Sequence, residues 1–87
     1  MISKKVTLVN GSGFHMRPAM NFANAMGKFA SDINIIYNGN TINGKSVMNI
    51  IAGCIKCGTE IELQCSGSDE NEAMAEAIKL IESGLGE

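Results

Sequence analysis

The dipeptide Asn38-Gly39 restricts the fold of this chain more than any other part of the sequence. It is typical of a two-residue hairpin turn, because both of its residues accept the positive φ that such a turn requires. Apolar residues alternate before it, at Ile33, Ile35 and Tyr37, and a second short run covers residues 40–42. The sequence therefore predicts two antiparallel strands joined by a tight turn.

Two further stretches are predicted to be strands. Residues 60–65 alternate strictly, which places Ile61, Leu63 and Cys65 on one inward face of a half-buried strand. Val6 to Val9 form a short apolar run, which is predicted to be the first strand. Asn10 to Gly13 follow it with a loop composition.

Three helices are predicted between and after these strands. Pro18 fits the first turn of a helix, since its φ is fixed and it lacks the amide that a helix start leaves unpaired. Ser46 is the expected N-cap of a short helix over residues 47–52 that ends at Gly53. Asp69 and Glu72 have the spacing of a capping box at the start of a last helix. The expected core faces of the two longer helices are Ala19, Phe22, Ala23, Met26, Phe29 and Ala30, and Ala73, Met74, Ala77, Ile78 and Ile81.

The predicted order is strand, helix, strand, strand, helix, strand, helix. Such an order favours an α+β open-faced sandwich, with a four-stranded antiparallel sheet covered on one face by helices. With 87 residues, 45% of them hydrophobic, the chain is expected to form a single domain over residues 1–87.

The charge balance and the cysteines exclude several classes of function. Seven basic and nine acidic residues give a net charge of -2, so the broad basic surface of a nucleic-acid-binding protein is missing. The apolar run at residues 6–9 is too short for a signal peptide or a membrane span. Three cysteines, an odd number, do not resemble a secreted disulfide framework. We therefore expect a cytoplasmic protein that contacts neither nucleic acid nor membrane directly.

The segment Gly13-Phe14-His15-Met16-Arg17-Pro18 holds the only histidine and the only proline of the chain. A helix start offers unpaired amides and the positive end of the helix dipole, so Met16 and Pro18 mark a predicted anion site. Arg17 adds a guanidinium group whose donors suit phosphate oxygens. This pattern suggests that His15 is a nucleophile that carries a phosphoryl group. The alternative is a cap or surface histidine without such a role.

Four segments in register resemble the HPr family, the histidine-containing phosphocarrier proteins of the phosphoenolpyruvate-dependent sugar phosphotransferase system. They are Gly13–Ala19, Asn43–Met48, Glu60–Ser66 and Gly67–Glu70. The resemblance covers essentially the whole chain and implies the same strand and helix order.

The resemblance implies that His15 accepts a phosphoryl group from phospho-Enzyme I and passes it to sugar-specific IIA components, with Arg17 beside it. Such a protein carries a group as a substrate of enzymes rather than acting as an enzyme, and we expect a monomer with no cofactor and no metal. The Gram-positive branch of the family implies phosphorylation of Ser46 by HPr kinase/phosphorylase and a role as corepressor with the catabolite control protein.

Several residues depart from the usual pattern of the family. Met16 and Met20 replace smaller residues, and Gly53-Cys54 stands where leucine and glycine are usual; Asn24 and Gly27 replace residues that are polar or basic in many members. Flexible methionine side chains suit docking on successive partners. The predicted docking residues are Met16, Met20, Val47, Met48 and Ile51.

Two other functions remain open from the sequence. One is a regulatory HPr-like protein that docks on a kinase or transcription factor without serving sugar uptake. The other is a thiol redox or metal-binding module built on Cys54 and Cys57, which have a CxxC spacing. That spacing follows a predicted helix end, whereas a redox pair relies on a helix N-terminus to stabilise its thiolate.

Overall fold

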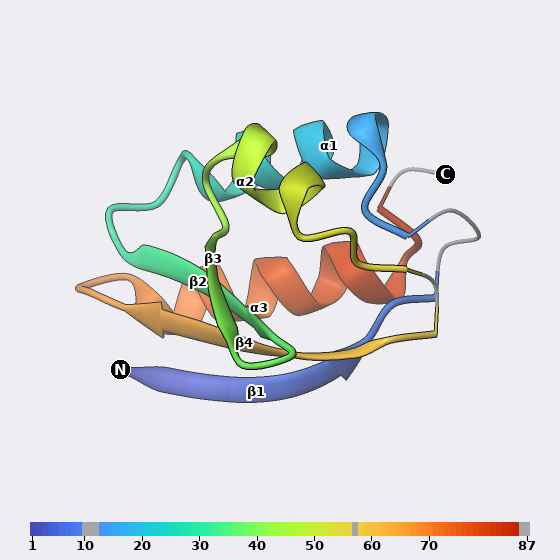
Figure 1. Ribbon diagram of the computed structural model, residues 1–87. Coiled ribbons are helices and arrows are strands. Elements are labelled where there is room, and N and C mark those ends of the chain that lie inside the picture. Colours follow the sequence, from blue (N-terminus) through green and yellow to red (C-terminus); the bar gives the residue numbers. More distant parts are fainter. Residues whose placement is uncertain (10–12, 57, 86–87) are drawn as a thin grey trace.

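The computed structural model describes residues 1–9, 13–56 and 58–85 (Figure 1). Its elements are β1 (Ile2–Thr7), α1 (Met16–Met26), β2 (Asp32–Tyr37), β3 (Asn40–Asn43), α2 (Val47–Ala52), β4 (Glu60–Ser66) and α3 (Glu70–Glu82). This is the order predicted from the sequence.

The four strands form one antiparallel sheet in the order β1-β4-β2-β3. The predicted hairpin between β2 and β3 is confirmed, with Asn38 at φ 53° and Gly39 at φ 80° in its turn. The late strand β4 lies between β1 and β2, where Leu63 faces Ile35 across the ladder. Through β4, the sheet therefore joins the first strand of the chain to the β2–β3 hairpin in its middle.

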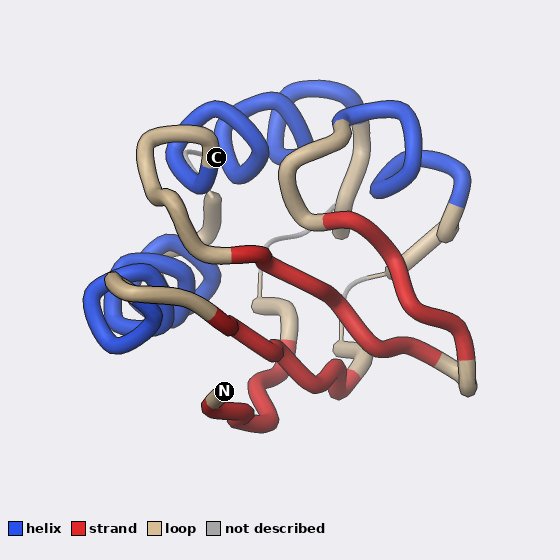
Figure 2. Tube along the Cα trace, turned by 90° about the vertical axis from the view of Figure 1, so that its left-hand side faces the viewer, coloured by secondary structure: helices blue, strands red, loops and turns tan. Residues whose placement is uncertain are grey.

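All three helices cover the same face of the sheet, and the other face is open (Figures 1 and 2). Alternation in β2 and β4 directs one set of side chains toward the helices, as predicted. The buried residues of the sheet and of the two longer helices are Ile33, Ile35, Ile42, Ile61, Leu63, Cys65, Pro18, Ala19, Phe22, Ala23, Met26, Ala73, Met74, Ala77 and Ile81. Burial raises the pKa of the Cys65 thiol, and the Glu70 and Asp69 carboxylates raise it further. Cys65 is thus a core residue, as predicted.

The first strand lies earlier than predicted. β1 pairs with β4 from Ile2 opposite Cys65 to Thr7 opposite Glu60. Leu8 is no longer in the strand and is buried, whereas Val9 is exposed. The prediction over residues 6–9 was wrong because it followed local hydropathy, while pairing with β4 selects the bounds of this edge strand.

The first helix starts as predicted, with Pro18 in its first turn, but ends earlier than predicted. It begins at Met16, two residues before Pro18, and ends at Met26 with Gly27 as the C-cap. Phe29 is only partly buried and Ala30 is exposed, and both lie beyond the helix. Their inclusion in the helical face was wrong, since the chain leaves the helix at Gly27.

The capping box predicted for Asp69 is absent from the structure. Asp69 is the N-cap residue of α3, but its carboxylate makes no capping hydrogen bond. It accepts hydrogen bonds instead from the Ala30 and Ser31 amides, both at 2.9 Å, and from the Ser31 hydroxyl. A different acidic residue, Glu70, bonds back to the segment before α3. Its carboxylate accepts a hydrogen bond from the Gly67 amide at 3.1 Å. Asp69 therefore ties the start of α3 to the segment before β2.

These hydrogen bonds, that of the Ser31 hydroxyl first, lower the pKa of Asp69 below its ordinary value of 3.8. A carboxylate with a lowered pKa in the folded state stabilises the fold above its ordinary pKa, and this contribution is lost as the pH falls through the folded-state value. We expect Asp69→Asn to lower the free energy of unfolding at neutral pH and to flatten the decrease of this free energy as the pH falls below about 5. Urea denaturation across this range measures both effects. Asp32→Asn, at an exposed aspartate, is the control, and equal pH profiles for the two variants would contradict the assignment.

Cys54, two residues past the end of α2, adopts a left-handed backbone conformation with φ 54°. This conformation costs a residue with a Cβ about 1–2 kcal/mol, and glycine avoids that cost while losing more chain entropy on folding. We expect Cys54→Gly to raise the free energy of unfolding by about 0.5–1 kcal/mol in urea denaturation. Cys54→Ala keeps the Cβ and is expected to give no such gain. An equal gain in both variants would show that removal of the thiol, and not relief of strain, is the cause.

Candidate functional site

His15 is the N-cap residue of α1 and has an extended backbone, with φ -78° and ψ -175°. The first helical hydrogen bond runs from the Ala19 amide to the His15 carbonyl at 2.9 Å. Within the described residues, the Met16 and Arg17 amides consequently have no helical acceptor, and Pro18 has no amide to offer. The imidazole itself is exposed and makes no capping hydrogen bond. The predicted placement of His15 at a helix start is confirmed.

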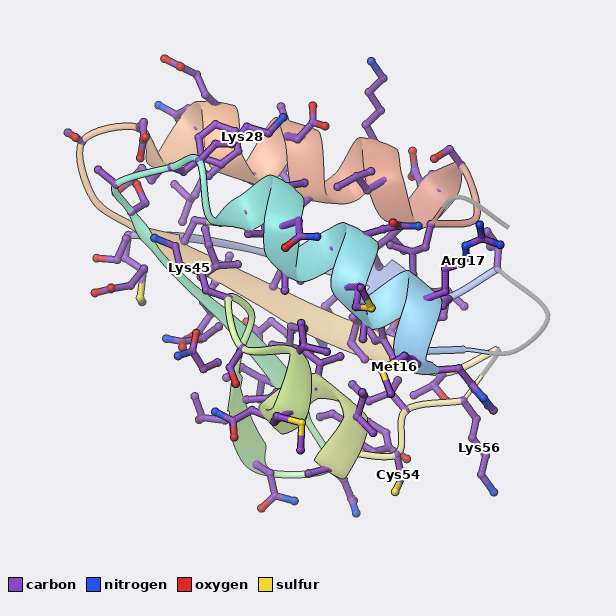
Figure 3. All side chains as sticks on the ribbon, turned by 90° about the horizontal axis from the view of Figure 1, so that it is seen from above. Met16, Arg17, Lys28, Lys45, Cys54 and Lys56 are labelled. Atoms are coloured by element: carbon purple, nitrogen blue, oxygen red, sulfur yellow. The ribbon has the colours of Figure 1, made fainter. Side chains whose placement is uncertain are left out.

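Pro18 and Arg17 have different surroundings at this helix start. Pro18 is buried and takes part in the core of α1, so it shapes the helix start without offering a donor. Arg17 is exposed, and no carboxylate of the described residues pairs with it. Its side chain lies at the same end of α1 as Met16 (Figure 3). The guanidinium group is thus free to meet an anion from solution or from a partner.

A hollow of about 340 Å³ opens beside His15. Its walls come from the start of α1 and from the segment that follows α2, and they are more apolar than polar. The lining residues are Phe14, His15, Met16, Ile51, Cys54, Ile55 and Lys56. The reactive histidine predicted from the sequence therefore borders a depression that an apolar side chain of a partner can enter.

Two buried residues hold the walls of this hollow together. The Phe14 amide donates a hydrogen bond to the Ile55 carbonyl at 2.9 Å, and both side chains are almost fully buried. The Phe14 ring also meets Phe22 edge-on, with 5.5 Å between the ring centroids. The exposed residues that follow, His15 and Lys56, are thereby held at the same hollow.

Ser46 caps α2 as predicted. Its hydroxyl oxygen accepts a hydrogen bond from the Asn49 amide at 3.3 Å, and its carbonyl accepts one from the Ile50 amide at 3.1 Å. The residue is partly exposed, so the hydroxyl combines a structural role with access from solution.

The predicted docking residues lie on two helices that pack against each other, α1 and α2. Met16, Met20 and Met48 are exposed by 61%, 44% and 74%, which confirms that these methionines lie outside the core. Val47 and Ile51, both on α2, are half-buried. We refer to these five residues as the apolar docking surface, a name for the predicted role, which stays a prediction. Of the five, Met16 and Ile51 also line the hollow beside His15.

Cys54 and Lys56 line the hollow beside His15, a position that the sequence did not predict for either residue. Both lie on the segment after α2, close to the start of α1 (Figure 3). The sequence contained only the CxxC spacing around them, which says nothing about His15, 39 residues before Cys54. Their position depends on the contact between Phe14 and Ile55.

Some expectations fall on parts of the chain that the structure does not describe. Cys57 lies outside the described residues, so the CxxC pair stays untested, and so do Gly11 and Ser12 of the loop before Phe14. Among the residues that are described, no group of three or more His, Cys, Asp or Glu is arranged to hold a metal ion. No helix in this part of the chain is both long and apolar enough to cross a bilayer.

Comparison with known proteins agrees with this geometry. The family model described as the PTS HPr component phosphorylation site matches residues 2–83. The phosphocarrier protein HPr of Mycoplasma capricolum is 48% identical over 67 residues, which cover 77% of this chain and 74% of that protein. The HPr of Neisseria meningitidis is 33% identical over 87 residues, covering 100% and 98%. The crystal structure of HPr-C-His from Thermoanaerobacter tengcongensis superimposes with a TM-score of 0.96 at 34% identity, covering 100% and 98%. The chain belongs to the HPr family of phosphocarrier proteins of the sugar phosphotransferase system.

Proposed function

We propose that His15 accepts a phosphoryl group from phospho-Enzyme I and donates it to the IIA components of sugar permeases. The observation that carries this proposal is the exposed imidazole of His15 at the start of α1, inside the segment matched by the family model of the phosphorylation site. The protein then acts as a carrier between enzymes in the cytoplasm, without a cofactor, and we expect it to do so as a monomer.

The transfer is an exchange of one bond for another. An unprotonated ring nitrogen of His15 attacks the phosphorus atom, the bond between phosphorus and the donor breaks, and its electron pair stays with the donor. The phosphoryl group brings two negative charges to the start of α1. The Met16 and Arg17 amides and the Arg17 guanidinium group provide donors and positive charge there, which offset this gain. The donation step reverses the same sequence on a IIA component.

The apolar docking surface gives this carrier a place to meet both donor and acceptor. Its methionines repack at low cost, because their side chains are unbranched and polarizable. Since Met16 and Ile51 also line the hollow beside His15, a partner bound on this surface covers the reacting nitrogen. Enzyme I and the IIA components are therefore expected to use this one surface in turn.

We expect His15→Ala to abolish uptake of the phosphoryl group and to leave the fold intact. The residue is exposed and carries no core area, so its loss should change the free energy of unfolding by less than about 0.5 kcal/mol. Incubation with Enzyme I and phosphoenolpyruvate, followed by intact mass, measures the uptake, and thermal unfolding measures the fold. One acid-labile phosphoryl group on the wild type and none on the variant is the expected result. Continued uptake by the variant would place the acceptor elsewhere in the chain.

Regulatory phosphorylation of Ser46 by HPr kinase/phosphorylase is the second part of the proposal, with the catabolite control protein as the reader of the modified form. The cap position supports it, because a phosphate there adds about -1.5 to -2 charges next to the first amides of α2 and needs no unfolding. Val47 and Met48 follow directly and belong to the apolar docking surface. A dianion at Ser46 would therefore oppose docking of acidic or apolar partners and favour a basic one.

We expect Ser46→Asp to slow transfer from Enzyme I to His15 while keeping or raising stability. The aspartate replaces one capping oxygen with another and adds charge at the favourable helix end. Initial rates of phosphorylation at several concentrations of the variant give kcat/KM for Enzyme I, and thermal unfolding gives stability. Ser46→Ala is the matched control: it removes the cap, costs about 1 kcal/mol and should leave transfer unchanged. If Ser46→Asp lost stability and kept the wild-type rate, both the cap and the shared surface would have to be given up.

A further inference from the structure

Lys56 is an exposed cation beside His15 that the phosphocarrier proposal does not use. It lies on the segment between α2 and β4, and it lines the same hollow as His15. Figure 3 shows Arg17 and Lys56 on opposite sides of Met16, at the same end of α1. The other two labelled lysines, Lys28 and Lys45, lie at the opposite end of that helix.

The backbone of Lys56 is fixed next to His15. The hydrogen bond from the Phe14 amide to the Ile55 carbonyl, 2.9 Å long, joins the two residues that immediately precede them. Phe14 is 3% exposed and Ile55 is 2% exposed, so this junction is anchored in the core. A lysine carries its charge on a flexible four-carbon stem, which lets the ammonium group swing over the hollow from such an anchor.

The ammonium group of Lys56 also has no competing partner in the described part of the chain. No carboxylate there lies within ion-pair distance of it, and none lines the hollow. By contrast, the ammonium group of Lys45 donates a hydrogen bond to the Phe29 carbonyl at 2.6 Å. Lys56 is therefore available to an anion that arrives at His15.

We propose that Lys56 is the second cation of the phosphoryl site and that its ammonium group pairs with the oxygens of the phosphoryl group on His15, opposite Arg17. This inference rests on the proposed function of His15. Lys56 forms and breaks no covalent bond: the bond from phosphorus to His15 forms as the bond to the donor breaks, and the electron pair of the broken bond stays with the donor. The lysine adds an ion pair that exists only in the phosphorylated state. It thereby sets how far the equilibrium lies toward the phosphorylated protein.

The expected change in the phosphorylation equilibrium is small because Lys56 is exposed to water. Attraction between opposite unit charges about 4 Å apart in water corresponds to about a fivefold change in an equilibrium constant, and exposed pairs often contribute less. A contribution of about two- to fivefold is therefore expected, and it should shrink as salt screens the charges.

An equilibrium measurement separates this effect from docking on Enzyme I. Each protein is equilibrated with catalytic Enzyme I at fixed phosphoenolpyruvate and pyruvate concentrations, and intact mass gives the ratio of phosphorylated to free protein. We expect a fall of about two- to fivefold for Lys56→Gln, little change for Lys56→Arg, and a smaller difference at high salt. Lys28→Gln is the matched control for loss of one exposed positive charge. A wild-type ratio in Lys56→Gln, or an equal fall in Lys28→Gln, would overturn the inference.

A second measurement needs no Enzyme I. Inorganic phosphate is titrated into the unphosphorylated proteins while the NMR shifts of the Met16 and Arg17 amides are followed. The dissociation constant should rise about two- to fivefold in Lys56→Gln and stay at the wild-type value in Lys28→Gln. Equal constants in Lys56→Gln and the wild type would contradict the role of Lys56. If the wild type took up no phosphoryl group from Enzyme I, the proposed function itself would fail, and this titration would still decide whether Lys56 belongs to the anion site.

Discussion

The hydrogen bond from the Phe14 amide to the Ile55 carbonyl holds the candidate site together. It joins the connection before α1 to the connection after α2, two segments far apart in the sequence. Further hydrogen bonds, from Leu8 to Thr59 and from Gly58 to Leu8, continue the pairing of these connections toward the sheet. Since Phe14 and Ile55 are both buried, the junction is as rigid as the core beneath it. This junction fixes the positions of the exposed residues around His15.

The core that stabilises the fold is separate from the exposed residues that are proposed to meet a partner. The core lies between the sheet and the helices, whereas His15, Arg17, Lys56 and the three exposed methionines contribute almost nothing to it. Changes at these exposed positions therefore cost little folding energy. This explains how Met16, Met20 and Cys54 can differ from the usual residues of the family without altering the arrangement of strands and helices. Cys54 is the exception with a cost of its own, because its backbone is left-handed.

The local distribution of charged side chains, rather than the net charge, determines whether an anion is attracted to the start of α1. The net charge is -2, yet Arg17 and Lys56 flank the start of α1, where no carboxylate lines the hollow. Acidic side chains occur instead on β4 and in the first turn of α3, among them Glu60, Glu62 and Glu70. A small protein can in this way present a positive end to an anion while remaining acidic as a whole.

The sequence by itself determined the features whose causes are local. The Asn38-Gly39 turn, the alternation of residues 60–65 and the Ser46 cap depend on neighbouring residues, and the structure confirms each of them. The position of His15 at a helix start belongs to this group, because the nearby proline marks the first turn. Even the family was recognisable, since its motifs are short segments in register along the chain.

Only the tertiary structure decided the features that depend on distant partners. β1 takes its bounds from pairing with β4, and the Asp69 carboxylate binds Ala30 and Ser31 instead of capping its own helix. Lys56 reaches the site through the contact of Phe14 with Ile55, about forty residues apart along the chain. Hydropathy and spacing describe what a residue prefers near itself in sequence, whereas pairing and packing between remote segments exist only once the chain has folded.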